Sequence, residues 1–142
     1  LLGQILDFAA NHTDMRGVEI VKDFAAELSK APIDGDQIRQ VAINLVLNAG
    51  AAMPDGGCLT VTTRQEDAFA VIVLADSGYG IADSDLERIF EPFYTTKERG
   101  TGLGLAITKQ IIEQHQGTID ITSRLGQGTT VTIRLPLVRE EI

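Results

Sequence analysis

The sequence has little of several residue types that would mark other classes of protein. It contains one cysteine, Cys58, so no disulfide can form within the chain, and this favours a reducing compartment. Basic residues are outnumbered, with Lys+Arg 12 against Asp+Glu 20 and a formal net charge of −8. Because nucleic-acid surfaces need an excess of positive charge, we expect no nucleic-acid partner. A polyphosphate ligand would need local positive charge or a metal ion, since the overall field repels it.

Long apolar runs are also missing from the sequence. No stretch approaches the roughly 20 residues that span a bilayer, and the N-terminus has no signal-peptide pattern. We therefore expect a cytoplasmic domain without membrane contact, whether or not a parent protein is membrane-anchored. The 142 residues, 44% of them hydrophobic, suffice for one domain with a sizeable core. Since the chain begins at Leu1 without methionine, we expect a piece of a longer protein: a single domain over 1–142, with its core in about 1–136.

Hydrophobic spacing predicts a mixture of helices and strands. Three segments have the apolar spacing of a helix, namely 1–10, 36–53 and about 102–115. Five segments alternate as strands do, namely about 18–24, 58–65, 69–75, 119–121 and 131–135. Ser84 and Glu87 match a capping box, which predicts a short helix over 85–90. Gly117 is expected to cap the helix that ends at His115.

The segment 36–53 is apolar on nearly every side, which is typical of a buried helix. One polar stripe remains, because Gln40, Asn44 and Asn48 follow one another at steps of four and share a face. Burying amides without partners costs roughly 1–3 kcal/mol per group, so something must satisfy them. Either they form an internal hydrogen-bond network, or they face a ligand cavity. In a cavity, amide oxygens would suit a hard cation such as Mg²⁺.

Asp76 ends an apolar strand and enters a turn with Gly78 and Gly80. Its carboxylate has two alternative roles. It can bond its own backbone as a turn-forming aspartate. Alternatively, it can accept a hydrogen bond from an exocyclic amine such as that of adenine, while the glycines allow close backbone approach.

A second glycine cluster, Gly100-x-Gly102-x-Gly104, precedes the helical segment at 102–115. It is either a flexible loop or an anion site, since free N–H groups at a helix N-terminus favour phosphate. It is neither a phosphate loop ending in Gly-Lys-Ser/Thr nor a dinucleotide fingerprint. Aromatic residues are only 5% of the chain, yet Phe90 and Phe93 lie just before this cluster. They either simply pin a loop to the core or, in doing so, also anchor a lid. Lys97 within that lid is either an ordinary solvated surface lysine or a group that reaches a phosphate.

Taken together and in this order, four motifs resemble those of sensor histidine kinases. They are the N box (Asn44-x-x-x-Asn48), the G1 box (Asp76-x-Gly78-x-Gly80-Ile81), the F box (Phe90-Glu91-Pro92-Phe93) and the G2 box (Gly100-x-Gly102-x-Gly104-Leu105). The resemblance covers about residues 1–135 and is to the catalytic, ATP-binding domain. It implies the Bergerat fold, an α/β two-layer sandwich with a mixed sheet under three helices. DNA gyrase, MutL and a class of heat-shock chaperones share this fold.

The resemblance implies ATP and Mg²⁺ as cofactors, with ADP as product. It implies that Asp76 holds the adenine amine, that Asn48 ligates Mg²⁺ with Asn44 beside it, and that Lys97 reaches phosphate. The glycines line the nucleotide cradle and the hinge of the lid. The nucleotide-binding residues implied are Asn44, Asn48, Asp76, Gly78, Gly80, Ile81, Phe93, Lys97, Gly100, Thr101, Gly102, Leu103, Gly104 and Leu105.

Two departures refine this expectation. Gyrase-like relatives have a glutamate as general base at the position of Asn44, and an amide cannot serve as that base, so hydrolysis of ATP is disfavoured. The family's phosphoacceptor histidine is also missing, because neither His12 nor His115 has the expected context. No catalytic residue is therefore assigned within the chain. We expect transfer of the γ-phosphate to a histidine on a separate helical dimerisation domain, and from there to a response regulator.

Two other functions are compatible with these motifs. The same boxes occur in protein serine kinases of the anti-sigma type. A nucleotide-binding docking module without transfer activity is the non-enzyme alternative. We expect the chain itself to be monomeric and its parent to be a homodimer.

Overall fold

The computed structural model describes residues 17–23, 35–53, 55–66, 68–90 and 104–136. Within them, one mixed sheet has the strand order β1-β2-β3-β5-β4. Its strands are β1 (Val18–Asp23), β2 (Gly57–Glu66), β3 (Phe69–Asp76), β4 (Thr118–Arg124) and β5 (Gly128–Pro136). β1 pairs with β2 in parallel, and the remaining neighbours pair antiparallel. The predicted strands are confirmed, and Phe24 lies outside the described residues.

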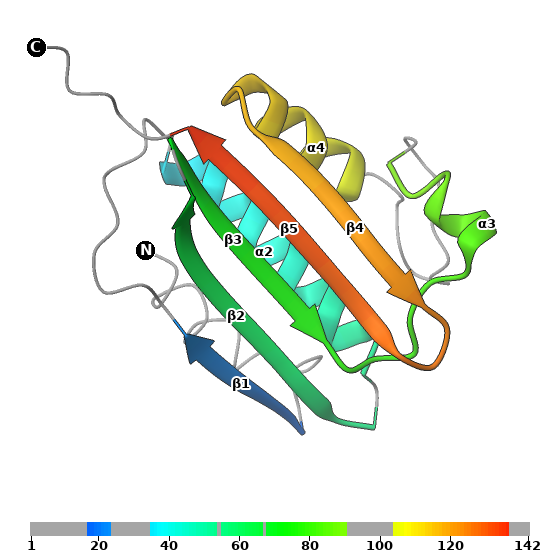
Figure 1. The fold of residues 1–142 in the computed structure, drawn as a ribbon. Coiled ribbons are helices and arrows are strands. Elements are labelled where there is room, and N and C mark those ends of the chain that lie inside the picture. Colours follow the sequence, from blue (N-terminus) through cyan, green and yellow to red (C-terminus); the bar gives the residue numbers. More distant parts are fainter. Residues whose placement is uncertain (1–16, 24–34, 54, 67, 91–103, 137–142) are drawn as a thin grey trace, which may run out of the picture.

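Two long helices, α2 (Gly35–Ala51) and α4 (Gly104–Gln114), cover one face of the sheet (Figure 1). This confirms the expected two-layer α/β sandwich. The helix expected over 1–10 and the lid residues lie outside the described part of the chain. Among the described helices, none is both long and apolar enough to cross a membrane.

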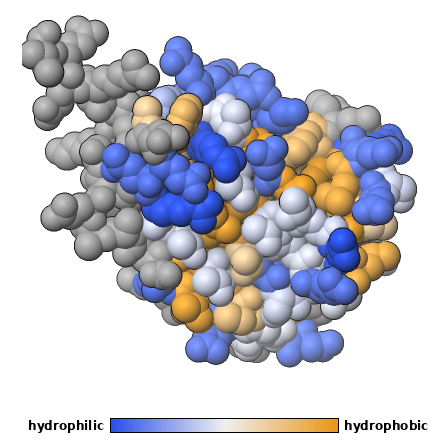
Figure 2. Space-filling view, viewed as in Figure 1, coloured by the Kyte–Doolittle hydropathy of each residue, from blue (hydrophilic) through white to orange (hydrophobic). Residues whose placement is uncertain are grey.

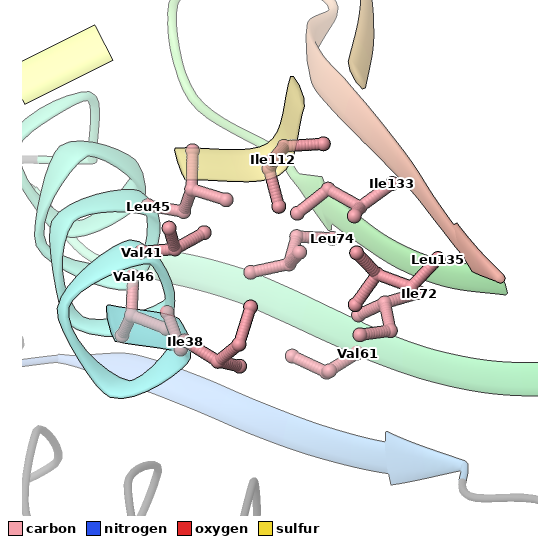
Figure 3. Close-up of a pocket in the computed structure, with 11 residues that line it drawn as sticks. Ile38, Val41, Leu45, Val46, Val61, Ile72, Leu74, Ile112, Ile133 and Leu135 are labelled. Carbon is pink, nitrogen blue, oxygen red and sulfur yellow. The ribbon is translucent and has the colours of Figure 1, made fainter. Parts of the chain in front are cut away.

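The core lies between α2 and the sheet, where one face of the strands meets the apolar helix. Val41, Leu45 and Val46 point from α2 toward side chains of β2, β3 and β5 (Figure 3). Full burial of one such side chain stabilises the fold by about 1.5–3 kcal/mol. A cavity of about 20 Å³ remains between these layers. Its lining is apolar, which keeps such a space dry and makes it an imperfection of packing rather than a site for a phosphate-bearing ligand.

On the face of the sheet that the helices leave uncovered, polar and apolar residues are mixed (Figure 2). Arg64 and Arg134 flank Val71 on the neighbouring strands, and Val71 is 0% exposed although it faces away from the helices. Glu66 joins the two arginines, at 2.8 and 3.9 Å. Val71 thus lies between two long side chains whose aliphatic stems suit the covering of an apolar residue, while such exposed ion pairs contribute little themselves.

The short helix after the first glycine turn differs from its prediction. α3 spans Asp83–Leu86, and turns follow it to Phe90. The capping box predicted for Ser84 and Glu87 is wrong, because the N–H of Leu86 bonds to the carbonyl of Ala82 at 2.9 Å and places Ser84 inside the helix.

The end of α4 also corrects a prediction. Gln116, not Gly117, has the left-handed conformation, with φ 61°. The N–H of Gly117 reaches back to the carbonyl of Ile112 at 2.9 Å, which closes the helix end. Gly117 is needed for a different reason: a Cβ on it would collide with the carbonyl oxygen of Arg134.

We expect Gln116→Gly to stabilise the protein by about 0.5–1 kcal/mol. A non-glycine residue in the left-handed region is strained by about 1 kcal/mol or more, and the extra freedom of glycine in the unfolded chain offsets part of the gain. Urea unfolding monitored by circular dichroism measures the difference. Gln114→Gly, two residues earlier within α4, is the control and should be destabilising by a similar amount. A loss of stability in Gln116→Gly would contradict the strain described.

Candidate functional site

The first glycine turn packs against the C-terminal end of α2. A Cβ on Gly78 would lie 2.5 Å from the carbonyl oxygen of Ala52, the residue after α2. The N–H of Tyr79 donates to the same oxygen at 3.1 Å. The end of β3, the end of α2 and the hairpin between β4 and β5 therefore meet at one end of the sheet (Figure 1).

The polar stripe of α2 runs toward this junction. Asn44, Asn48 and Ala52 follow one another at steps of four along one face, and the N–H of Ala52 bonds to the carbonyl of Asn48 at 3.1 Å. Asn48 thus lies one helical turn from the residue that contacts Gly78. Both asparagines are half-buried, so their side chains are partly accessible to solvent. Among the described residues, every buried side-chain nitrogen and oxygen has a hydrogen-bond partner.

Asp76 lies on the face of the sheet that the helices cover, in register with the fully buried Leu59. The N–H of Gly78 donates to its Oδ1 at 2.9 Å. The turn-forming role of Asp76 is therefore present. A carboxylate accepts about four hydrogen bonds, so this bond leaves capacity for a ligand.

The electrostatics of Asp76 reflect this position. Desolvation by burial raises the pKa of its carboxyl group above the ordinary value, while the backbone hydrogen bonds from Gly78 and Thr129 lower that pKa and offset part of the effect. A half-buried carboxylate with remaining acceptor capacity is suited to receive an N–H group from a ligand.

Gly80 places the next part of the turn against the β4–β5 hairpin. Its φ is 77°, and an added Cβ would collide with the carbonyl oxygen of Arg124. The N–H of Ile81 then donates to Oγ of Ser123 at 2.8 Å. Thus Gly78 contacts α2 and Gly80 contacts the hairpin, and each glycine is required by a close approach.

The second half of the predicted site is described only in part. Phe93, Lys97, Gly100, Thr101, Gly102 and Leu103 lie outside the described residues. Gly104 begins α4, and Leu105 packs against the hydrophobic core. Phe90 also packs on the core, with the ammonium of Lys109 4.9 Å from its ring centre.

Sequence reasoning missed Ala52, Ser123 and Thr129, although all three contact the predicted turn. Ser123 and Thr129 belong to another hairpin, more than 40 residues away along the chain. The turn Gly126-x-Gly128 joins β4 to β5. Its contact with Asp76, where a Cβ on Gly128 would collide with the carbonyl oxygen, appears only in the fold.

These features coincide with those of one known family. The sequence model described as "Histidine kinase-, DNA gyrase B-, and HSP90-like ATPase" matches residues 33–139. The chain belongs to this family.

Curated relatives place it near the histidine kinases of this ATPase family. Sporulation kinase E of Bacillus subtilis is 39% identical over 138 residues, which cover 96% of this chain and 19% of that protein. The sensor histidine kinase ZraS of Escherichia coli is 39% identical over 137 residues, covering 96% of this chain and 30% of that protein. The chain therefore spans less than a third of the length of these two relatives.

Solved structures agree with this assignment to the ATPase family. The catalytic domain of the histidine kinase ThkA, in a nucleotide-free form, has a TM-score of 0.84 at 30% identity, covering 95% of this chain and 89% of that one. Full-length ShkA in complex with AMPPNP has a TM-score of 0.86 at 27% identity, covering 99% of this chain and 30% of that one. The resemblance to a histidine kinase catalytic domain with the Bergerat fold is confirmed.

Proposed function

We propose that this domain binds Mg·ATP and transfers the γ-phosphoryl group to a histidine on a separate helical domain of a longer two-component sensor kinase. The observation that supports this most directly is the half-buried carboxylate of Asp76, which borders a turn packed on the end of the asparagine-bearing helix. An adenine amine would donate to this carboxylate, and the helix would run toward the phosphates.

The other residues of the site have roles that follow from their chemistry. Gly78, Gly80 and Ile81 form the turn beside the base, and the N-terminal end of α4 at Gly104 offers N–H groups to phosphate. Lys97, Phe93, Leu105 and the glycine-rich residues 100–103 complete the proposed site, by analogy with the boxes of the family. These individual roles stay predictions.

The donor set fits a magnesium ion bound chiefly by the nucleotide. Asn48 and Asn44 would supply neutral amide oxygens, which are hard ligands. Mg²⁺ takes few protein ligands and is coordinated largely by phosphate oxygens and water. A bound Mg²⁺ would neutralise phosphate charge that a domain with a net charge of −8 otherwise repels.

Transfer rather than hydrolysis follows from the amide at position 44. Hydrolysis needs a base to deprotonate water, and Asn44 cannot act as one. In transfer, an imidazole nitrogen of the acceptor forms the new P–N bond, the bond to the β–γ bridging oxygen breaks, and ADP leaves. We propose that the phosphate then passes to a response regulator, and that the full-length protein is a homodimer.

The expected result is incorporation of phosphate into a helical histidine-bearing domain when this chain, Mg²⁺ and γ-labelled ATP are supplied together. The acceptor is the helical histidine-bearing domain proposed for the same longer protein, and the control is that domain with its phosphoacceptor histidine replaced by Gln. The product should be acid-labile, as phosphohistidine is, and chelation of Mg²⁺ should abolish it.

Acid-stable phosphate on a serine would support the anti-sigma type of kinase instead. ATP binding without transfer to this acceptor or to the acceptor domain of any other sensor kinase would support a docking module.

A further inference from the structure

Ser123 on β4 connects three segments through one hydroxyl group, and it belongs to none of the four boxes. Its Oγ accepts from the N–H of Ile81 at 2.8 Å and donates to the carbonyl of Gly128 at 2.9 Å. A third bond, of 2.8 Å, joins it to the hydroxyl of Thr129. A serine hydroxyl has one proton and two acceptor lone pairs. Since that proton goes to Gly128, the Thr129 hydroxyl is the donor, and the bonding capacity of Ser123 is full.

These partners lie on both sides of Asp76. Ile81 follows the turn that begins at Asp76. Gly128 and Thr129 begin β5, which pairs with the end of β3. Thr129 is the register partner of Asp76 on β5, and its backbone N–H lowers the pKa of the Asp76 carboxyl group. One hydroxyl therefore fixes the far end of the turn against Thr129, the residue paired with Asp76.

The hairpin itself is held without Ser123. The N–H of Gln127 bonds to the carbonyl of Arg124 at 3.0 Å, and the N–H of Gly126 bonds to the carbonyl of Tyr79 at 2.7 Å. The pairing of β4 with β5 also continues on either side of Ser123, at Thr122 and Arg124. Removing the hydroxyl should therefore leave the hairpin closed and loosen only the placement of Ile81 and Thr129.

We infer that Ser123 is a positioning residue for the proposed adenine site, because its hydroxyl locks the turn after Asp76 to the start of β5. This inference rests on the proposed function and adds a residue on a strand that carries none of the predicted site. Ser123 acts through Asp76 and Thr129 and is not assigned a contact with the nucleotide.

The test compares Ser123→Ala with Thr122→Ala, its exposed neighbour on the opposite face of the sheet. Loss of the hydroxyl should weaken ATP binding about tenfold by calorimetry, the size expected for one well-placed hydrogen-bond network. Thr122→Ala should bind like the wild type. Ser123→Thr keeps a hydroxyl and should restore most of the affinity. Should Ser123→Ala fold poorly by circular dichroism, Ser123→Cys gives the same comparison, since a thiol is a weak donor and acceptor.

A second readout does not depend on nucleotide binding. The carboxyl carbon of Asp76 can be titrated by NMR in each variant. With Thr129 displaced, the carboxylate loses a hydrogen bond that lowers its pKa, so the pKa should rise in Ser123→Ala and stay unchanged in Thr122→Ala.

Wild-type affinity together with an unchanged Asp76 titration in Ser123→Ala would overturn the inference. If the wild type itself failed to bind ATP, the proposed function would fall. The NMR comparison would still decide whether Ser123 positions Asp76.

Discussion

Asp76→Asn is expected to weaken the binding of ATP by roughly 10- to 100-fold. A hydrogen bond to a charged group contributes about 1.5–3 kcal/mol, and this substitution removes the charge while keeping the size of the side chain. The amide oxygen can still accept from the N–H of Gly78, so the turn should keep its shape. The amide NH₂ group would then face the amine of adenine, which is also a donor. Calorimetry with the non-hydrolysable analogue AMPPNP measures the loss.

The same substitution should stabilise the unliganded domain at neutral pH. Because burial raises the pKa of Asp76, the folded state holds its proton more tightly than the unfolded state does. The stability linked to this group is therefore full at pH values below the unfolded pKa and is lost as the pH rises through the folded pKa. Asparagine has no charge to bury. The gain in unfolding free energy over the wild type should be larger at pH 7 than at pH 3.

Asp120→Asn is the matched control for both measurements. Asp120 lies on β4, with 71% of its side chain exposed, and pairs with Arg134 on the face that the helices leave uncovered. It should change neither the nucleotide affinity nor the stability of the domain appreciably, because an exposed ion pair contributes little. If the two variants bound AMPPNP equally well, Asp76 would have no place in the proposed site.

Gly80→Ala should destabilise the protein by about 3 kcal/mol or more. Two effects add: alanine is strained at a φ of 77°, and its Cβ would collide with the carbonyl of Arg124, which belongs to the β4 backbone and cannot move away cheaply. Urea unfolding at neutral pH is the measurement.

Gly126→Ala separates these two effects. Gly126 has nearly the same φ, 78°, but an added Cβ there meets no heavy atom of the described residues within 4 Å. We expect it to cost only the backbone strain, about 1 kcal/mol. Equal losses in the two variants would show that the close contact between Gly80 and the hairpin contributes nothing to stability.

Local patterns predicted the elements well and their partners poorly. The apolar residues on nearly every side of α2 predicted a buried helix, because the burial of a helix depends mainly on its own surface. In the strand from Val18 to Asp23, apolar and polar residues alternate. This alternation fits a parallel and an antiparallel neighbour equally well, so the residues did not predict the parallel pairing with β2. The sequence did not predict that Gln116 has the left-handed conformation while Gly117 is needed for a close approach. The carbonyl oxygen that a Cβ on Gly117 would meet belongs to Arg134 on β5, far away along the chain.

The candidate site was predictable where its residues are close in sequence. Asn44 and Asn48 share a face by helical spacing alone, and the glycines beside Asp76 mark a turn. The turn also bonds to Ala52 at its centre and to Ser123 at its end. These contacts depend on how α2 and the β4–β5 hairpin pack beside β3. Such contacts between distant segments have no local pattern, so only the four boxes in order carried the prediction.

The turn after Asp76 is tied down on both sides by its own main chain, through Tyr79 to the end of α2 and to the hairpin. Its amides are consequently part of the same cooperative unit as the sheet, and local opening of the turn would require breaking contacts with both neighbours. At the proposed site a nucleotide would therefore meet a preorganised surface, and little of its binding energy would be consumed in ordering this part of the chain.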